Sequence, residues 1–128
     1  MATMHVEVVS AEKRLFEGEA NEVYARSLEG EIGILPGHQP ALLTLDIAPV
    51  RINLADGGQE TVAVHHGFLY FQDNNLVVLA DMAELESEIE QQRAERDIER
   101  YEERLSKEED AETRAALSRA KTRREVAT

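Results

Sequence analysis

The sequence predicts a β + α chain: an N-terminal antiparallel β-sandwich of about ten strands, followed by a C-terminal antiparallel two-helix hairpin. All seven glycines and all three prolines lie at or before residue 67 of 128. Both residue types are common in the turns between short strands, and their absence from the rest of the chain permits long helices. Charge also changes near residue 83, because residues 1–82 hold four basic and twelve acidic side chains and residues 83–128 hold ten and fourteen. We therefore expect a sandwich domain at 1–83 and a helical domain at 84–128.

Alternation and regular breaks predict the strands of the first domain. Val6 and Val8 alternate with polar neighbours and so share one face of a strand. Turn-forming residues then recur about every ten positions, which is typical of an antiparallel sandwich or barrel. The expected strand-forming runs after the first are Glu22–Leu28, Glu31–Leu35, Leu42–Ile47, Val50–Leu54, Glu60–His65, Phe68–Gln72 and Leu76–Ala80.

The helical hairpin is predicted from a start signal and a polar break. Ser87 and Glu90 have the spacing of a capping box, so the first helix is expected at about 88–106. A polar break follows, and the second helix is expected at about 112–125. Because that helix is rich in alanine and has Leu117 as its main large apolar residue, it buries little surface. We expect it to be the less firmly held element.

Composition narrows the classes of function. A net charge of -12 disfavours binding to nucleic acid or to anionic lipid. The chain has no cysteine, and it contains neither an apolar run of membrane-spanning length nor the apolar core of a signal peptide. It is therefore expected to be soluble, without direct membrane insertion.

Motifs of catalysis and metal binding are missing. The glycine-rich phosphate loop, the dinucleotide fingerprint and the Gly-x-Ser-x-Gly nucleophile elbow are absent. The four histidines show no ligand spacing, and His65 and His66 point to opposite faces of a strand, so packing or surface roles are expected. The residues predict a non-catalytic module without a metal.

A basic stripe on the first helix is the first candidate binding surface. At 100° per residue, its cations share one face, separate from an apolar stripe. They are Arg93, Arg96, Arg100, Arg104 and Lys107. This spacing describes either a solvated helix face or a surface for an acidic partner. The second reading is based on the like-charge i,i+4 pairs, each of which is unfavourable by about 0.2–0.5 kcal/mol in an isolated helix.

The second candidate is the segment Ser27–Pro40, which places three glycines and two prolines around a short strand. Glycine supplies positive φ and proline fixes φ, so the path of this loop is tightly specified. It is either an ordinary turn or a rigid contact surface, which binds a partner at low ordering cost.

At this loop the chain resembles the epsilon subunit of the rotary ATP synthase. The Gly30–His38 segment (GEIGILPGH), followed by Pro40 and Leu43-Thr44, is similar to that family's signature. Three further stretches agree in order and spacing: Val8–Glu12, His66–Leu69 and Val78–Asp81.

The resemblance implies a non-catalytic central-stalk subunit of the proton-translocating ATP synthase, peripheral on the cytoplasmic face of the cell membrane. The implied partners are the gamma subunit, the membrane rotor ring and, transiently, the catalytic alpha and beta subunits. The loop residues Glu29, Glu31, Gly37 and His38 would lie near the ring and the shaft. The basic stripe would meet an acidic segment of the catalytic subunits when the hairpin extends, and would restrain ATP hydrolysis.

Some members of the family also bind regulatory ATP through an Ile/Leu-Asp-x-x-Arg-Ala motif. The corresponding residues are Ile89, Glu90, Arg93 and Ala94, with glutamate in place of aspartate. No other cofactor is implied. The alternative function is therefore a free-standing nucleotide-sensing module, in which the hairpin closes over ATP.

Overall fold

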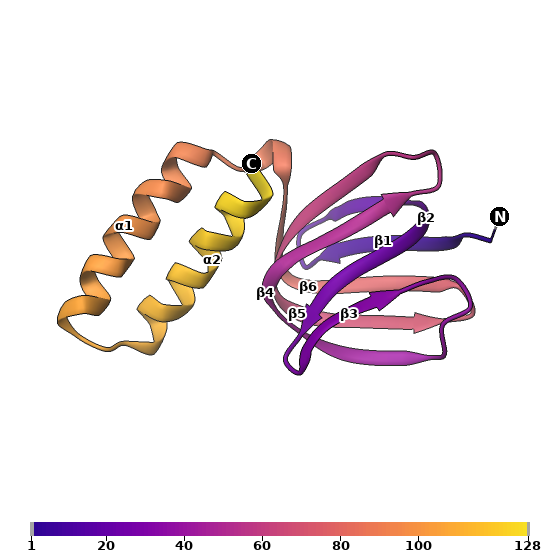
Figure 1. The fold of residues 1–128 in the computed structure, drawn as a ribbon, viewed down its shortest axis with the longest axis horizontal. Helices are drawn as coiled ribbons and strands as arrows, with labels where there is room; N and C mark the ends of the chain where they lie inside the picture. Colours follow the sequence, from indigo (N-terminus) through magenta and orange to yellow (C-terminus); the bar gives the residue numbers. More distant parts are fainter. Residues whose placement is uncertain (1, 128) are drawn as a thin grey trace.

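The computed structural model describes residues 2–127 as a β-sandwich with a helical hairpin beside one of its ends (Figure 1). Six strands come first, and a short 3-10 helix (η1) joins them to two α-helices. The bounds are β1 Met4–Ser10, β2 Arg14–Ser27, β3 Gly30–Ile34, β4 Ala41–Leu54, β5 Gln59–Gln72, β6 Asn75–Leu85, η1 Glu86–Glu88, α1 Gln91–Lys107 and α2 Ala111–Ala127.

The strands form one sheet that closes on itself. Their order is β1-β6-β5-β4-β2-β3, and β1 also pairs with β2. All pairs are antiparallel except β1 and β6, which run parallel. Closure leaves β3 as the strand attached outside the ring, next to the loop singled out in the sequence.

The predicted sandwich and hairpin are confirmed, but the strand count of about ten is wrong. The runs predicted as Leu42–Ile47 and Val50–Leu54 join into β4, which continues through the buried Pro49. Similarly, Glu60–His65 and Phe68–Gln72 join into β5. Each break lies within one long strand, because the register between β4 and β5, and between β5 and β6, is the same on both sides of it.

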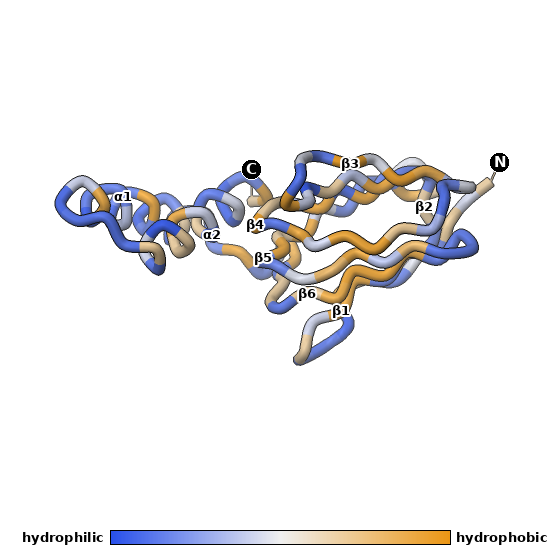
Figure 2. The backbone as a smooth tube through the Cα atoms, turned by 90° about the horizontal axis from the view of Figure 1, so that it is seen from below, coloured by the Kyte–Doolittle hydropathy of each residue, from blue (hydrophilic) through white to orange (hydrophobic). Residues whose placement is uncertain are grey.

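The interior of the sandwich follows from alternation along these strands. In β1, Met4, Val6 and Val8 are buried while the residues between them are partly exposed. The same pattern in β5 and β6 buries Leu69, Phe71 and their neighbours. Figure 2 shows hydrophobic residues running along the strands, whereas much of the hairpin is hydrophilic. The sandwich therefore has its own apolar core.

The helices differ from the prediction in where they begin and in which one is held. Helix α1 begins at Gln91 rather than near 88, and α2 spans Ala111–Ala127. The predicted capping box is wrong: the residue before α1 is Glu90, whose side chain makes no capping bond. Instead, the Glu88 carboxylate accepts the Leu85 backbone N–H at 2.9 Å. The chain therefore turns through η1 before α1 can begin.

Helix α2 packs against the sandwich, and α1 packs mainly on α2 (Figure 1). The expectation that α2 is the less firmly held helix is wrong. Its small residues allow a close approach: Ala120, Thr122 and Val126 are buried, and the Thr122 hydroxyl donates to the Ile47 carbonyl at 3.4 Å. The apolar stripe of α1 meets α2 through the buried Ala94 and Ile98. Burial of α2 on the strands thus depends on shape rather than on large side chains.

The division at residue 83 stays a prediction. Strand β6 continues two residues beyond it, to Leu85, which pairs with Val62. A cut intended to separate the hairpin from the intact strand therefore belongs after Leu85. Within residues 2–127, no helix is both long enough and apolar enough to cross a membrane.

Candidate functional site

The loop residues predicted from the sequence lie on β3 and in the turns at its two ends. Glu29 occupies the β2–β3 turn and Glu31 lies on β3; both are exposed. Gly37 has φ +85°, and its N–H donates to the Asn74 side chain at 2.7 Å. The half-buried His38 ring stands edge-on to Phe71 with ring centroids 5.9 Å apart. The loop is therefore tied to the β5–β6 turn, which gives it a defined shape.

Beside this loop lies an exposed apolar patch that the sequence analysis did not single out. The apolar face, as we call it, consists of Leu42, Phe68, Tyr70 and Leu79, with exposed fractions of 68%, 50%, 44% and 51%. Cross-strand pairing places them together on one surface of β4, β5 and β6, since Leu42 pairs with Tyr70 and Phe68 pairs with Leu79. A contiguous apolar patch on a charged protein is typical of a protein-binding surface.

The basic stripe on α1 is exposed along its whole length. Three of its cations lie near carboxylates of the same segment: Arg96 with Glu90, Arg100 with Asp97, and Lys107 with Glu103, at 3.4–3.8 Å. These exposed pairs contribute little to stability. The stripe is consequently accessible to a partner in the arrangement shown.

All four residues of the nucleotide-binding motif line one pocket of about 260 Å³ at the start of α1. Ile89 and Glu90 come from the turn before the helix, and Arg93 and Ala94 from its first turn. Glu88 of η1 also lines the pocket, and two residues come from more distant elements, Glu84 on β6 and Arg123 on α2. Sequence spacing gave no signal for these two, because tertiary packing alone brings them to the motif.

Glu84 joins the hairpin to the sandwich. Its Oε1 accepts a hydrogen bond from Arg123 Nε on α2 at 2.7 Å and lies 2.9 Å from Nε2 of the buried His65 on β5. Burial tends to raise the pKa of Glu84, but the hydrogen bonds from His65 and Arg123 and the charge of Arg123 outweigh it and lower the pKa. The carboxylate therefore stays ionised and holds both partners.

We expect Glu84→Gln to weaken the docking of the hairpin by about 1–2 kcal/mol, because a charge-assisted hydrogen bond at a partly buried site becomes neutral. Native-state hydrogen exchange of the α2 amides will then accelerate roughly tenfold, while amides of the β-strand core remain protected. Glu125→Gln is the matched control, since its ion pair with Arg51 is more exposed. Equal acceleration in both variants would contradict the assigned role of Glu84.

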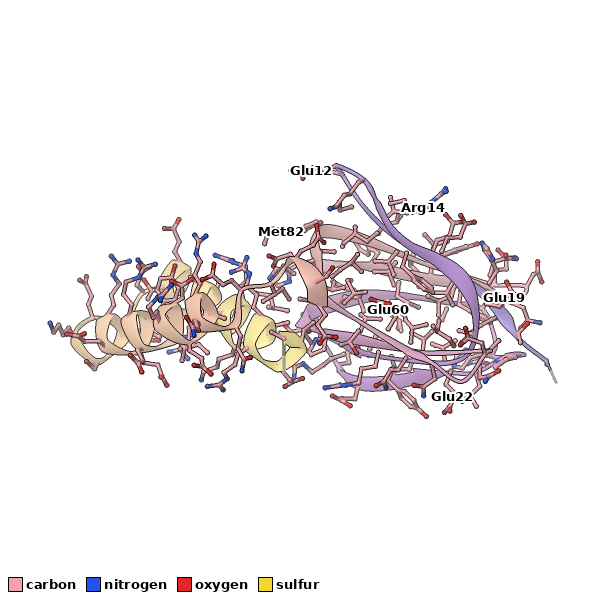
Figure 3. All side chains as sticks on the ribbon, turned by 90° about the horizontal axis from the view of Figure 1, so that it is seen from above. Glu12, Arg14, Glu19, Glu22, Glu60 and Met82 are labelled. Carbon is pink, nitrogen blue, oxygen red and sulfur yellow. The ribbon has the colours of Figure 1, made fainter. Side chains whose placement is uncertain are left out.

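A histidine–carboxylate cluster lies across β1 and β2. His5 Nε2 lies 2.9 Å from Glu17, and His5 Nδ1 lies 3.0 Å from Glu19. His5, Glu7 and Glu17 have a ligand-like arrangement, with donor atoms within 4.8 Å of one another, which sequence spacing did not reveal because cross-strand register creates it. Arg14 pairs with Glu7 and Glu17, so the cluster is an ion-pair network. Figure 3 shows Glu19 at the end of the sandwich remote from the helices.

The hydrogen bonds that the His5 ring donates, first to Glu19 and then to Glu17, raise the pKa of His5. The protonated ring is therefore favoured in the folded state. Its contribution to stability is fully present below the ordinary value of 6.5 and is lost as pH rises through the higher folded-state pKa. We expect the melting-temperature difference between the wild type and His5→Gln to shrink between about pH 6 and pH 8. A difference that stays constant over this range would contradict the coupling.

Comparison with known proteins first defines the class. Residues 3–86 match the family model described as the ATP synthase delta/epsilon chain β-sandwich domain. The fold is similar to that of a chain in the mitochondrial ATP synthase of Euglena gracilis, with a TM-score of 0.83 and 18% identity over 95% of this chain and 79% of that one. The chain is therefore of the delta/epsilon class, a sandwich followed by two helices.

Sequence relatives define the family within that class. The ATP synthase epsilon chain of Streptomyces avermitilis is 50% identical over 99 residues, which cover 77% of this chain and 80% of the relative. That of Bordetella avium is 41% identical over 117 residues, covering 91% and 83%. This chain belongs to the ATP synthase epsilon chain family, whose members are non-catalytic subunits of that complex.

Proposed function

We propose that the protein is a central-stalk subunit that binds the gamma shaft through its sandwich and regulates ATP hydrolysis through its hairpin. The apolar face carries the proposal. Leu42, Phe68, Tyr70 and Leu79 form a surface on a rigid sheet, apart from the hairpin. Such a surface binds a protein partner with little loss of conformational freedom. Because the chain belongs to an ATP synthase subunit family, we propose the gamma subunit as the partner of the apolar face.

The loop next to the apolar face is suited to contacting the membrane rotor ring. Leu28 is exposed beside Glu29, and both line a small pocket with Leu42, so the apolar face and the loop are continuous. A polar, rigid edge formed by Glu29, Glu31 and the Gly37-His38 turn is suited to the polar loops of a ring. The protein would then be peripheral, on the cytoplasmic face of the cell membrane.

The hairpin fits a regulatory role because it is attached to the sandwich by a small set of contacts. Within residues 2–127, α2 makes most of the contacts of the hairpin with the strands, and the Glu84–Arg123 bond is a polar part of that interface. An element held this way can exchange between docked and extended states at modest free-energy cost. When extended, the Arg93–Lys107 stripe would meet an acidic segment of the catalytic alpha and beta subunits.

Two measurements test the proposal. The full chain, mixed with gamma at micromolar concentration, is expected to form a stable one-to-one complex, and no association would overturn the proposal. The ATPase activity of the assembled complex is then compared with and without residues 86–128. Higher hydrolysis without the hairpin is expected, and unchanged hydrolysis would remove the regulatory part.

A second candidate function is nucleotide sensing, as a property of the hairpin or of a free-standing module. The specific observation is that Ile89, Glu90, Arg93 and Ala94 line one pocket with the cation Arg123. Arg93 and Arg123 are suited to a polyphosphate, although four carboxylates, Glu84, Glu88, Glu90 and Asp97, line the same pocket. Calorimetry of the full chain with ATP is expected to show millimolar or tighter binding that Arg93→Ala removes. Absence of binding would exclude this function while leaving binding to gamma unaffected.

A further inference from the structure

A second pocket, of about 470 Å³, lies where the C-terminal half of α2 meets β4. It is distinct from the pocket at the start of α1 and shares no lining residue with it. Its volume falls in the range of small-molecule sites, about 300–1,000 Å³. Neither the apolar face nor the basic stripe includes it, so its residues are not explained by the proposed function.

Three cations line this pocket, on a chain whose net charge is -12. Arg26 comes from β2, and Lys121 and Arg124 come from successive turns of α2. Within residues 2–127, neither Lys121 nor Arg124 forms an ion pair. The carboxylate in the lining, Glu125, is bonded to Arg51 at 2.8 Å. The pocket therefore concentrates positive charge.

The polar groups of the pocket wall are mainly donors. The Ile47 carbonyl already accepts hydrogen bonds from Arg26 at 2.9 Å and from the Thr122 hydroxyl at 3.4 Å. Arg26 also lies 3.7 Å from Asp46, yet a guanidinium has five N–H groups, so donors remain for a ligand. The Ser118 hydroxyl adds another donor. This donor-rich, cationic lining matches the acceptor oxygens of a phosphate.

We propose that the pocket binds a phosphate or diphosphate group of a small anion, with Arg26 on one side and Lys121 and Arg124 on the other. The cations come from both the sandwich and the hairpin. A ligand that contacts both binds the docked arrangement better than an extended one. By linkage, it stabilises the docked hairpin and opposes its release.

The test titrates the isotope-labelled full chain with inorganic pyrophosphate and follows its amide resonances. Saturable shifts are expected at Arg26, Ile47 and residues 118–125. The double variant Lys121→Gln/Arg124→Gln is expected to bind at least about tenfold more weakly, as two charge-assisted contacts are lost. The control Arg96→Gln/Lys107→Gln removes one arginine and one lysine from the exposed face of α1 and is expected to retain the wild-type affinity within about twofold.

Further titrations distinguish a nucleotide from inorganic pyrophosphate as the ligand, and this pocket from the one at the start of α1. ADP binding more tightly than pyrophosphate identifies the diphosphate of a nucleotide, and tighter pyrophosphate binding identifies the inorganic anion. Arg93→Gln is expected to leave these shifts unchanged. Slower exchange of the α2 amides with pyrophosphate, lost in the Lys121/Arg124 variant, supports the bridging role. Unsaturable shifts, equal weakening in both double variants, or loss of the shifts in Arg93→Gln would overturn the proposal.

Discussion

Gly67→Ala is expected to destabilise the sandwich by roughly 3–5 kcal/mol, because two costs coincide at this position. Gly67 has φ +137°, a conformation that side chains rarely adopt. A Cβ there would lie 2.2 Å from the Leu79 carbonyl oxygen and 2.7 Å from the Ala80 Cα. Both atoms are backbone of β6, which cannot move aside without breaking the sheet.

Thermal unfolding of the full chain is the measurement, with an expected fall in melting temperature of about 10–20 °C. Gly30→Ala is the matched control, since Gly30 has a similar φ of +128° but no atom within 4 Å of the added Cβ. It carries only the conformational cost, about 1–2 kcal/mol. Equal losses in the two variants would show that the approach of β5 to β6 contributes nothing to the special requirement at Gly67.

Gly67 also explains why the strands were counted wrongly from the sequence. His66 has φ 62° and Gly67 φ 137°, so β5 bends there, yet pairing with β4 resumes unchanged on either side at His65 and Gly67. A glycine of this kind indicates a local bend, and nothing local distinguishes a bend within one strand from a turn between two. The positions of glycine and proline predicted the fold class, whereas the continuity of β4 and β5 depends on their neighbours in the sheet.

The candidate binding surfaces also differ in whether the local sequence predicts them. Helical periodicity placed Arg93, Arg96 and their companions on one exposed face, which the structure bears out in position, because that pattern is local. The alternation of Phe68 and Tyr70 was also in the sequence, but which face of β5 stays uncovered depends on how the sandwich closes, since Leu69 and Phe71 on the other face belong to its core. The bond between Glu84 and Arg123 spans 39 positions and has no local signature.

Tyr70→Asp is expected to weaken the complex with gamma at least 100-fold, or about 2.7 kcal/mol. Tyr70 lies within the apolar face, between Leu42 on β4 and Val77 on β6. Aromatic residues at the centre of an interface contribute much of its affinity, and a carboxylate at this position would be desolvated against apolar neighbours. The dissociation constant, measured by calorimetry with purified gamma, reports the loss.

Tyr24→Asp is the matched control, because the two tyrosines differ mainly in their place on the sandwich. They are 40% and 44% exposed, and each hydroxyl donates to a side chain two residues away, Glu22 or Gln72. Both substitutions therefore carry the same intrinsic cost to a strand. Tyr24 lies on β2, opposite Arg51 and outside the apolar face, so its variant should bind gamma within about threefold of wild type. If Tyr24→Asp lost binding and Tyr70→Asp retained it, gamma would dock on the β2 side and the apolar face would need a different partner.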